Sequence, residues 1–129
     1  MIKRLTHQEK ELLLRDLSAR LPYDTQVYSQ NENDWFDDEI STAIIDNLIN
    51  DEYIPKPYLF PLSSLPQIAE EHEDEFNKII ECQLDDIQTN DIMLSAFVME
   101  THLYNKYHID YNNLIPKGLA IDATNLNIY

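Results

Sequence analysis

Apolar residues recur every three or four positions near the start of the chain, which is the spacing of one face of a helix. Four leucines lie at this spacing between positions 13 and 21, and Pro22 ends the run because proline cannot continue a helix. Thr6 and Glu9 stand three residues apart just before it. That spacing is typical of a capping box, in which each side chain accepts a hydrogen bond from the other residue's backbone N–H. The pattern predicts a helix over residues 7–20.

Two further apolar stripes with helical spacing lie in the second half of the chain. The first predicts a helix over residues 65–84, with acidic residues on the opposite face. Ser64 and Gln67 have capping-box spacing here, and Pro66 lies in the first turn, where its missing N–H costs little. The second stripe is wider and predicts a more deeply buried helix over residues 91–107.

The pattern between the first two of these helices is mixed. Residues 25–29 predict a short strand, and residues 31–34 predict a turn that relies on Asn and Asp in place of glycine. Residues 35–54 fit either one helical face or two strands, and their β-branched residues favour strands. Three prolines between positions 55 and 61 exclude a helix there and favour an edge strand or an extended crossing.

Together these elements predict an α+β fold in a single domain over residues 1–129, and the hydrophobic content of 43% is enough for a core. Three main helices would pack around a small antiparallel sheet from residues 24–60, and this sheet could be barrel-like. The alternative is a mostly α fold, because residues 35–54 also fit a helix.

The charge of the chain is strongly negative, at −15 over 129 residues. Residues 1–20 hold five basic and three acidic residues, so the rest of the chain carries all of the excess negative charge. Such a surface repels phosphate backbones and anionic lipids, which argues against direct nucleic-acid binding and against binding to a membrane. A basic protein partner fits this charge, and so does a purely solubilising role.

The sequence also bears on the cellular compartment. No apolar run approaches the roughly 18 residues that a membrane span needs, and the charged start does not predict a secretory signal. Cys82 is the single cysteine, so no disulfide can form within the chain. These features predict a cytoplasmic protein.

The segment 106–123 contains candidate chemistry. His108 and Asp110 stand two residues apart and could form the acid/base pair of a small hydrolase. The same positions fit a helix junction, in which Asp110 caps the next turn and His108 lies at a helix C-terminus, where the charged ring is favoured. Gly118 predicts a turn with positive φ. We prefer the junction, because no serine or cysteine nucleophile lies nearby in sequence.

A metal site is a weaker alternative, built from His72, His102 and carboxylates. The chain lacks the histidine pairs and cysteine pairs that are typical of metal sites. Its single glycine also rules out a glycine-rich loop that would cradle phosphate. We therefore predict no metal and no cofactor, and a non-enzymatic protein is favoured over an enzyme.

The acidic segment 24–52 contains no basic residue, and it includes Trp35, Phe36, Asp37 and Asp38. An exposed Trp–Phe pair beside carboxylates is a candidate interaction site, because aromatic residues often anchor protein interfaces. The alternative is that both rings fold back over the edge of the core.

Three blocks of the chain, "LLLRDLSARLPY", "IPKPYLFPLSS" and "YHIDYNNLIPKGLAIDA", carry a family resemblance. The chain resembles a family of small uncharacterised proteins of gut bacteria and of their mobile elements and phages. The resemblance covers most of the chain apart from residues 28–52, a region that is longer and more strand-like in such relatives. This family has no assigned chemistry, so the resemblance implies an association with mobile DNA and no particular activity.

Three functions are consistent with these observations. The first is a small non-enzymatic accessory protein that binds another, unidentified protein. The second is an acidic mimic of nucleic acid that inhibits a nucleic-acid-binding protein. The third is a small hydrolase or metal-dependent enzyme that uses His108 and Asp110. The sequence leaves the oligomeric state open.

Overall fold

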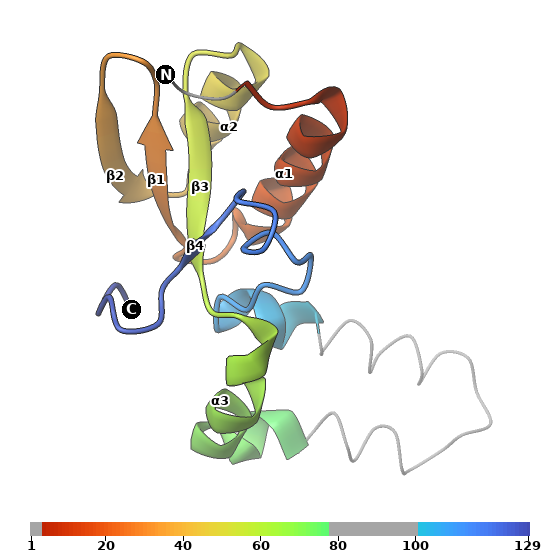
Figure 1. Cartoon of the computed structure of the whole chain (residues 1–129). Coiled ribbons are helices and arrows are strands. Elements are labelled where there is room, and N and C mark those ends of the chain that lie inside the picture. The colour runs from red at the N-terminus through yellow and green to blue at the C-terminus, as the bar shows by residue number, and fades with distance from the viewer. Residues whose placement is uncertain (1–3, 78–100) are drawn as a thin grey trace, which may run out of the picture.

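The computed structural model describes residues 4–77 and 101–129 (Figure 1). The helices are α1 (His7–Arg20), α2 (Thr42–Ile49) and α3 (Leu65–Glu71), and a 3-10 turn, η1 (Leu62–Ser64), precedes α3. The strands are β1 (Gln26–Gln30), β2 (Trp35–Glu39), β3 (Ile54–Leu59) and β4 (Ile121–Asp122). Helical turns also cover 73–77 and 101–106.

The strands form one sheet in the order β2-β1-β3-β4. β1 pairs antiparallel with both β2 and β3, whereas β3 and β4 pair in parallel. The α+β class is therefore confirmed. The antiparallel pairing predicted within residues 24–60 is confirmed for β1, β2 and β3, and β4 adds a parallel pair from residues 121–122, outside that range. The barrel-like closure is wrong, because the sheet formed by the described strands stays open.

The first helix follows its prediction closely. Thr6 caps α1, and both hydrogen bonds of the capping box are present, from Glu9 N–H to Thr6 Oγ1 and from Thr6 N–H to Glu9 Oε1. The predicted strand at 25–29 corresponds to β1, and the predicted turn at 31–34 joins β1 to β2.

The preference for two strands over residues 35–54 is wrong in its middle. β2 and the first residue of β3 are strand, but α2 lies between them. The Ser41 hydroxyl accepts a hydrogen bond from Ile44 N–H and caps this helix. Ile44 and Leu48 are four residues apart and both are buried in the core. The cap and this shared face outweigh the strand propensity of the isoleucines.

The second predicted helix is confirmed only at its start. α3 ends at Glu71, and helical turns resume over 73–77. Pro66 lies in the first turn as expected, but Ser64 is helical in conformation and its hydroxyl makes no cap hydrogen bond. Residues 78–84 of this predicted helix lie outside the described residues. So do residues 91–100 of the helix predicted over 91–107.

The core lies between the sheet and the two helices α1 and α2, which cover the same side of the sheet in Figure 1. Its fully buried side chains include Leu13 and Leu17 from α1, Leu48 from α2, and Val27 and Leu59 from the strands. Burying a large aliphatic side chain of this kind contributes about 1.5–3 kcal/mol. This core fixes one face of the sheet and leaves the other face open.

The prolines of β3 sit where they disturb the sheet least. Tyr28 and Gln30 on β1 lie opposite Lys56 and Ile54, so the prolines at 55 and 57 fall between these pairs. Because backbone N–H groups alternate in direction along a strand, the missing proline N–H groups would point away from β1. On that side β4 pairs only with the later residues Tyr58 and Leu59.

A buried ion pair connects α1 to the segment that follows the 101–106 turn. The Asp16 and Arg20 side chains are both 0% exposed, and Arg20 Nε lies 2.9 Å from Asp16 Oδ2. Arg20 Nη2 also donates to the Ile109 carbonyl at 2.7 Å, and Asn112 Nδ2 donates to Asp16 Oδ1 at 2.8 Å. The pair therefore binds the 109–112 backbone and side chains directly.

Breaking one side of this pair is expected to destabilise the fold strongly. Arg20→Met leaves the Asp16 charge buried without its cation, so we expect the free energy of unfolding to fall by about 3–5 kcal/mol. Denaturant unfolding measures this change. The double variant Asp16→Leu/Arg20→Met is the control, since it removes both charges and is expected to lose less than Arg20→Met alone. A single-variant loss below about 1 kcal/mol would contradict a structural role.

Candidate functional site

The sheet has an open face opposite the core. Side chains that lie opposite each other on paired strands share a face. Val27 and Ser29 are buried on the core side, so the residues that alternate with them belong to the open face. These are Gln26, Tyr28 and Gln30 on β1, Trp35, Asp37 and Glu39 on β2, and Ile54, Lys56 and Tyr58 on β3.

Aromatic rings gather on this open face. Trp35 is 61% exposed, and its ring stacks on Tyr28 with centroids 5.7 Å apart. Tyr58 extends across β1 and donates a hydrogen bond of 2.7 Å to Asp37 Oδ1. Burial, followed by this bond to the Asp37 carboxylate, raises the pKa of Tyr58, so its hydroxyl remains a donor at neutral pH.

The structure divides the four residues of the predicted interaction site between the two faces of β2. Trp35 and Asp37 lie on the open face, whereas Phe36 and Asp38 belong to the other face. Phe36 makes an edge-to-face contact with Tyr53 at 5.1 Å. Only the first pair therefore shares a face of the sheet with Tyr28 and Tyr58, and the Tyr58 side chain is buried.

Two aspartates protect the free edge of β2. Ile40 N–H donates to the Thr25 carbonyl, so the even-numbered residues of this strand direct their N–H groups toward β1. The N–H groups of Trp35 and Glu39 therefore point away from β1. Asp34 Oδ1 accepts the first of these N–H groups and Asp38 Oδ1 accepts the second, each at 2.8 Å. The edge thus offers few free donors to an added strand.

Negative charge is concentrated at the end of β2. Glu39 is hydrogen-bonded to Asp24, and this bond together with the charge of Asp24 raises the pKa of Glu39. Asp37 and Asp38 are also exposed beside it. A carboxyl group whose pKa rises because of its neighbours indicates a region that attracts cations.

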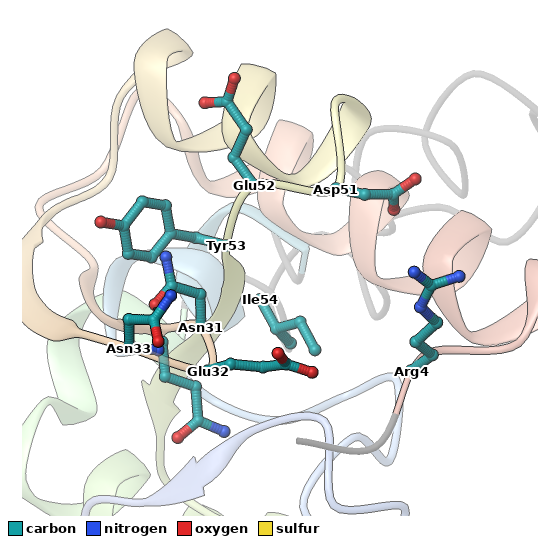
Figure 2. A pocket seen from close by; sticks show the side chains of 9 residues that line it. Arg4, Asn31, Glu32, Asn33, Asp51, Glu52, Tyr53 and Ile54 are labelled. Carbon is teal, nitrogen blue, oxygen red and sulfur yellow. The ribbon is translucent and has the colours of Figure 1, made fainter. Parts of the chain in front are cut away.

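A cavity of about 290 Å³ lies at the opposite end of the hairpin. Figure 2 shows the Glu32 side chain extending toward Ile54, while Arg4 and Asp51 lie on the far side. The Asp51 carboxylate pairs with Lys10 at 3.0 Å. Acidic and basic groups are mixed around this cavity, so it does not continue the acidic surface of β2.

His108 occupies the predicted junction, but its environment differs from the prediction. Its φ is +58°, and its ring stacks on Tyr129 with centroids 3.7 Å apart. Nδ1 lies 3.2 Å from Thr25 Oγ1. Burial, and then the charge of Arg20, lower the pKa of His108 to about 4. The expectation of a charged ring is therefore wrong, and the ring is neutral at pH 7.

Asp110 has the capping role that its position predicted. Its two carboxylate oxygens accept the N–H groups of Leu114 and Ile115 at 2.7 and 2.8 Å. His108 and Asp110 are thus directed to different partners, although they are close in sequence. This arrangement favours the junction over an acid/base pair.

Tyr129 is a structural residue that sequence reasoning missed. Its hydroxyl accepts a hydrogen bond from Gln26 N–H and donates one to the Tyr58 carbonyl, both at 2.8 Å. It therefore links β1 and β3 where their direct pairing has ended at Val27 and Pro57. Burial raises the pKa of Tyr129 to about 12. No local pattern could have shown this contact, because 103 positions separate Tyr129 from Gln26.

A second cavity, of about 480 Å³, lies between α3, residues 106–108 and residues 124–129. The side chains around it include His72, Tyr107, His108 and Tyr129. It is the only one of the two cavities with histidines in its lining, since the hairpin cavity is lined by none.

The remaining predicted positions are Gly118 and the histidines His72 and His102. Gly118 has a φ of +73°, as expected of a turn glycine. Of the histidines considered for a metal, His72 stacks on Tyr107 while His102 lies near Tyr23. Across residues 4–77 and 101–129, no three histidine, cysteine or acidic side chains are placed to hold a metal ion.

No helix within the described part of the chain is long and apolar enough to cross a membrane. Comparison with known proteins yields no relative, because no family model, curated protein or solved structure matches the chain.

Removing the edge protection of β2 is expected to promote self-association. In Asp34→Ala/Asp38→Ala, two outward N–H groups lose their acceptors and become available to a second copy. Sedimentation equilibrium should show a concentration-dependent increase in apparent mass over the parent chain. Asp34→Asn/Asp38→Asn is the matched control, because the amide carbonyl still accepts while the charge is lost. Equal association of both double variants would assign the effect to charge alone.

Acid is expected to destabilise the fold through His108. Its pKa is near 6.5 when unfolded and about 4 when folded, so between these values the unfolded chain binds the extra proton. The contribution of the neutral ring to stability is complete above pH 6.5 and is lost as the pH falls toward about 4. Urea unfolding above and within this window measures the loss.

His108→Asn is the control for this titration, because Asn tolerates positive φ and does not titrate near neutral pH. The variant should lose less stability on acidification than the parent chain. An NMR titration that places the pKa of His108 near its ordinary value would contradict the buried neutral ring.

Proposed function

We propose that this is a non-enzymatic accessory protein that binds a basic protein partner through the open face of its sheet, with Trp35 as the anchor. The single observation that carries this proposal is the 61% exposure of Trp35 on a stacked aromatic pair beside carboxylates. Tryptophan is enriched among the residues that dominate binding energy at protein interfaces.

Contacts within the chain hold the aromatic side chains of this face in place. Trp35 stacks on Tyr28, and the Tyr58 hydroxyl is bonded to Asp37, so binding costs these rings little conformational entropy. Preorganised aromatic side chains provide a large contact area at a low entropic cost. Trp35 on β2 and Tyr28 on β1 therefore form a supported aromatic patch.

The charge around the patch specifies the partner. Asp37 and Glu39 share the open face with Trp35, while Lys56 is the only cation among the side chains of that face. Complementary charge accelerates encounter and excludes acidic partners. We infer a partner with lysine or arginine residues around an apolar contact, and no direct binding to nucleic acid or membrane.

The partner is expected to dock on side chains and not to extend the sheet. Asp34 and Asp38 already accept the outward N–H groups on either side of Asp37. An incoming strand would have to displace these carboxylates.

The nucleic-acid mimic is the weaker function. The carboxylates of Asp34, Asp37 and Asp38 each accept a hydrogen bond from within the chain, so they have structural roles that need no ligand. The hydrolase is also weaker, because Asp110 binds backbone N–H groups and His108 is buried. A cytoplasmic site of action and a link to mobile DNA remain predictions from the sequence.

The test compares the parent chain with Trp35→Ala as baits in lysate of a native host, washed at low and high salt. The parent should retain a basic protein that Trp35→Ala releases. With that protein purified, Trp35→Ala should weaken binding by about 2 kcal/mol, or roughly 30-fold.

Leu62→Ala is the matched control, because Leu62 is also an exposed large apolar side chain, at 45%, but lies in η1 away from the sheet face. It should bind like the parent chain. Retention of the same partner by Trp35→Ala, or capture of acidic proteins only, would refute the proposed surface.

A further inference from the structure

The cavity between α3 and residues 124–129 has the size of a small-molecule site. Its volume of about 480 Å³ falls within the roughly 300–1,000 Å³ that is usual for ligand pockets. It lies away from β2, because its lining comes from Phe60 after β3, from Ser64 and α3, and from residues 106–108 and 124–129. It is therefore separate from the proposed protein-binding face.

Two stacked aromatic pairs contribute to the lining of this cavity. The His72 ring stacks on Tyr107 with centroids 4.1 Å apart and planes at 24°. The His108 ring stacks on Tyr129 at 3.7 Å and 10°. All four residues line the cavity, and His72 and Tyr129 retain exposed surface there. Paired rings of this kind suit a planar ligand, which can stack on them.

Several polar groups at the cavity are uncommitted. Among interactions of the described residues, the side chains of Ser64, His72, Thr124 and Asn125 make no hydrogen bond. These four side chains offer both donors and acceptors without a formal charge when the imidazole is neutral. These side chains would bind the hydrogen-bond donors and acceptors on the edge of a heteroaromatic ring.

Two charged side chains line the cavity, and only Lys106 belongs to an ion pair of the described residues. Glu71 accepts a hydrogen bond from Gln67 Nε2 at 3.4 Å and keeps its negative charge. Lys106 Nζ lies 2.9 Å from Glu75 Oε2, and the Tyr107 hydroxyl donates to the other carboxylate oxygen of Glu75 at 2.6 Å. A ligand phosphate would have to compete with Glu75 for Lys106. The net charge of −15 also opposes any polyanion.

We propose that this cavity binds an uncharged planar heteroaromatic molecule of the nucleobase or nucleoside class. The rings of His72 and Tyr129 stack on the ligand, and Ser64 and Asn125 bond to its polar edge. The neutral state of His108, which burial maintains, keeps a second cation out of the cavity.

The test is an NMR titration of the full chain with adenosine, guanosine, cytidine and uridine, and with ribose as the probe that lacks the planar base. At least one nucleoside should give saturable shifts at residues 64–72 and 124–125, and ribose should not. His72→Ala and Asn125→Gly should each weaken that nucleoside at least about fivefold, since one stack or one bonding side chain is lost.

Two matched control variants show whether a loss of binding comes from the cavity or from a general loss of stability. Asn125 and Asn127 both have positive φ, at +70° and +54°, so glycine preserves the backbone at either position. Asn127→Gly, and Ser63→Ala next to Ser64, alter side chains that do not line the cavity and should bind like the parent chain.

Three outcomes would overturn the proposal. They are the absence of saturable shifts with all four nucleosides, equal shifts with ribose, and unchanged binding in both cavity variants. Tighter binding of adenosine monophosphate than of adenosine would overturn the uncharged ligand, because it would show that Lys106 leaves Glu75 for a phosphate.

Discussion

The buried pair between Asp16 and Arg20 is the constraint on which the arrangement of the C-terminal segment depends. Two charges that are removed from water must be compensated by contacts of good geometry, and a missing partner costs several kcal/mol. Here the compensation comes from distant residues, since Arg20 also binds the Ile109 carbonyl and Asn112 binds Asp16. The Arg20 guanidinium further lies 5.0 Å from the centre of the Tyr111 ring. Any other placement of residues 109–112 would leave the buried guanidinium and carboxylate without these hydrogen-bond partners, so the interaction specifies position more than it adds net stability.

This fixed segment then determines the surroundings of His108 and the end of the sheet. Phe60 N–H donates to the His108 carbonyl, and Asp110 N–H donates to the Phe60 carbonyl. The segment therefore pairs in parallel with Phe60, the residue that follows β3. His108 is held in a positive-φ conformation between Thr25 and Tyr129. The Tyr129 hydroxyl in turn joins β1 to β3. One histidine ring therefore connects the core, the C-terminal residues and the second cavity.

Local features of the fold were predictable from the sequence, and long-range ones were not. The helix at 7–20 and the turn at 31–34 followed from a capping box and turn residues, which act within a few positions. The helical interpretation of this segment ranked below two strands because isoleucines satisfy both patterns, and the deciding Ser41 cap is a single residue. The parallel strand β4 and the Tyr129 contact depend on residues more than 60 positions apart, for which no periodic signal exists. Of the candidate sites, Trp35 and Asp37 were found by composition, whereas their supporting contacts with Tyr28 and Tyr58 required the register of the strands.

The acidic residues of β2 show why charge alone did not indicate a function. Asp34 and Asp38 protect the backbone of an edge strand, and Asp37 holds the Tyr58 hydroxyl under the aromatic patch. A strand that must remain unpaired and still expose tryptophan needs such protection, because an exposed apolar edge promotes aggregation. The same carboxylates surround Trp35 with negative potential, which opposes the approach of acidic surfaces, including that of a second copy of the chain. If the proposed partner binds here, solubility and partner selection follow from one arrangement, and the aromatic rings distinguish this face from a merely solvated edge.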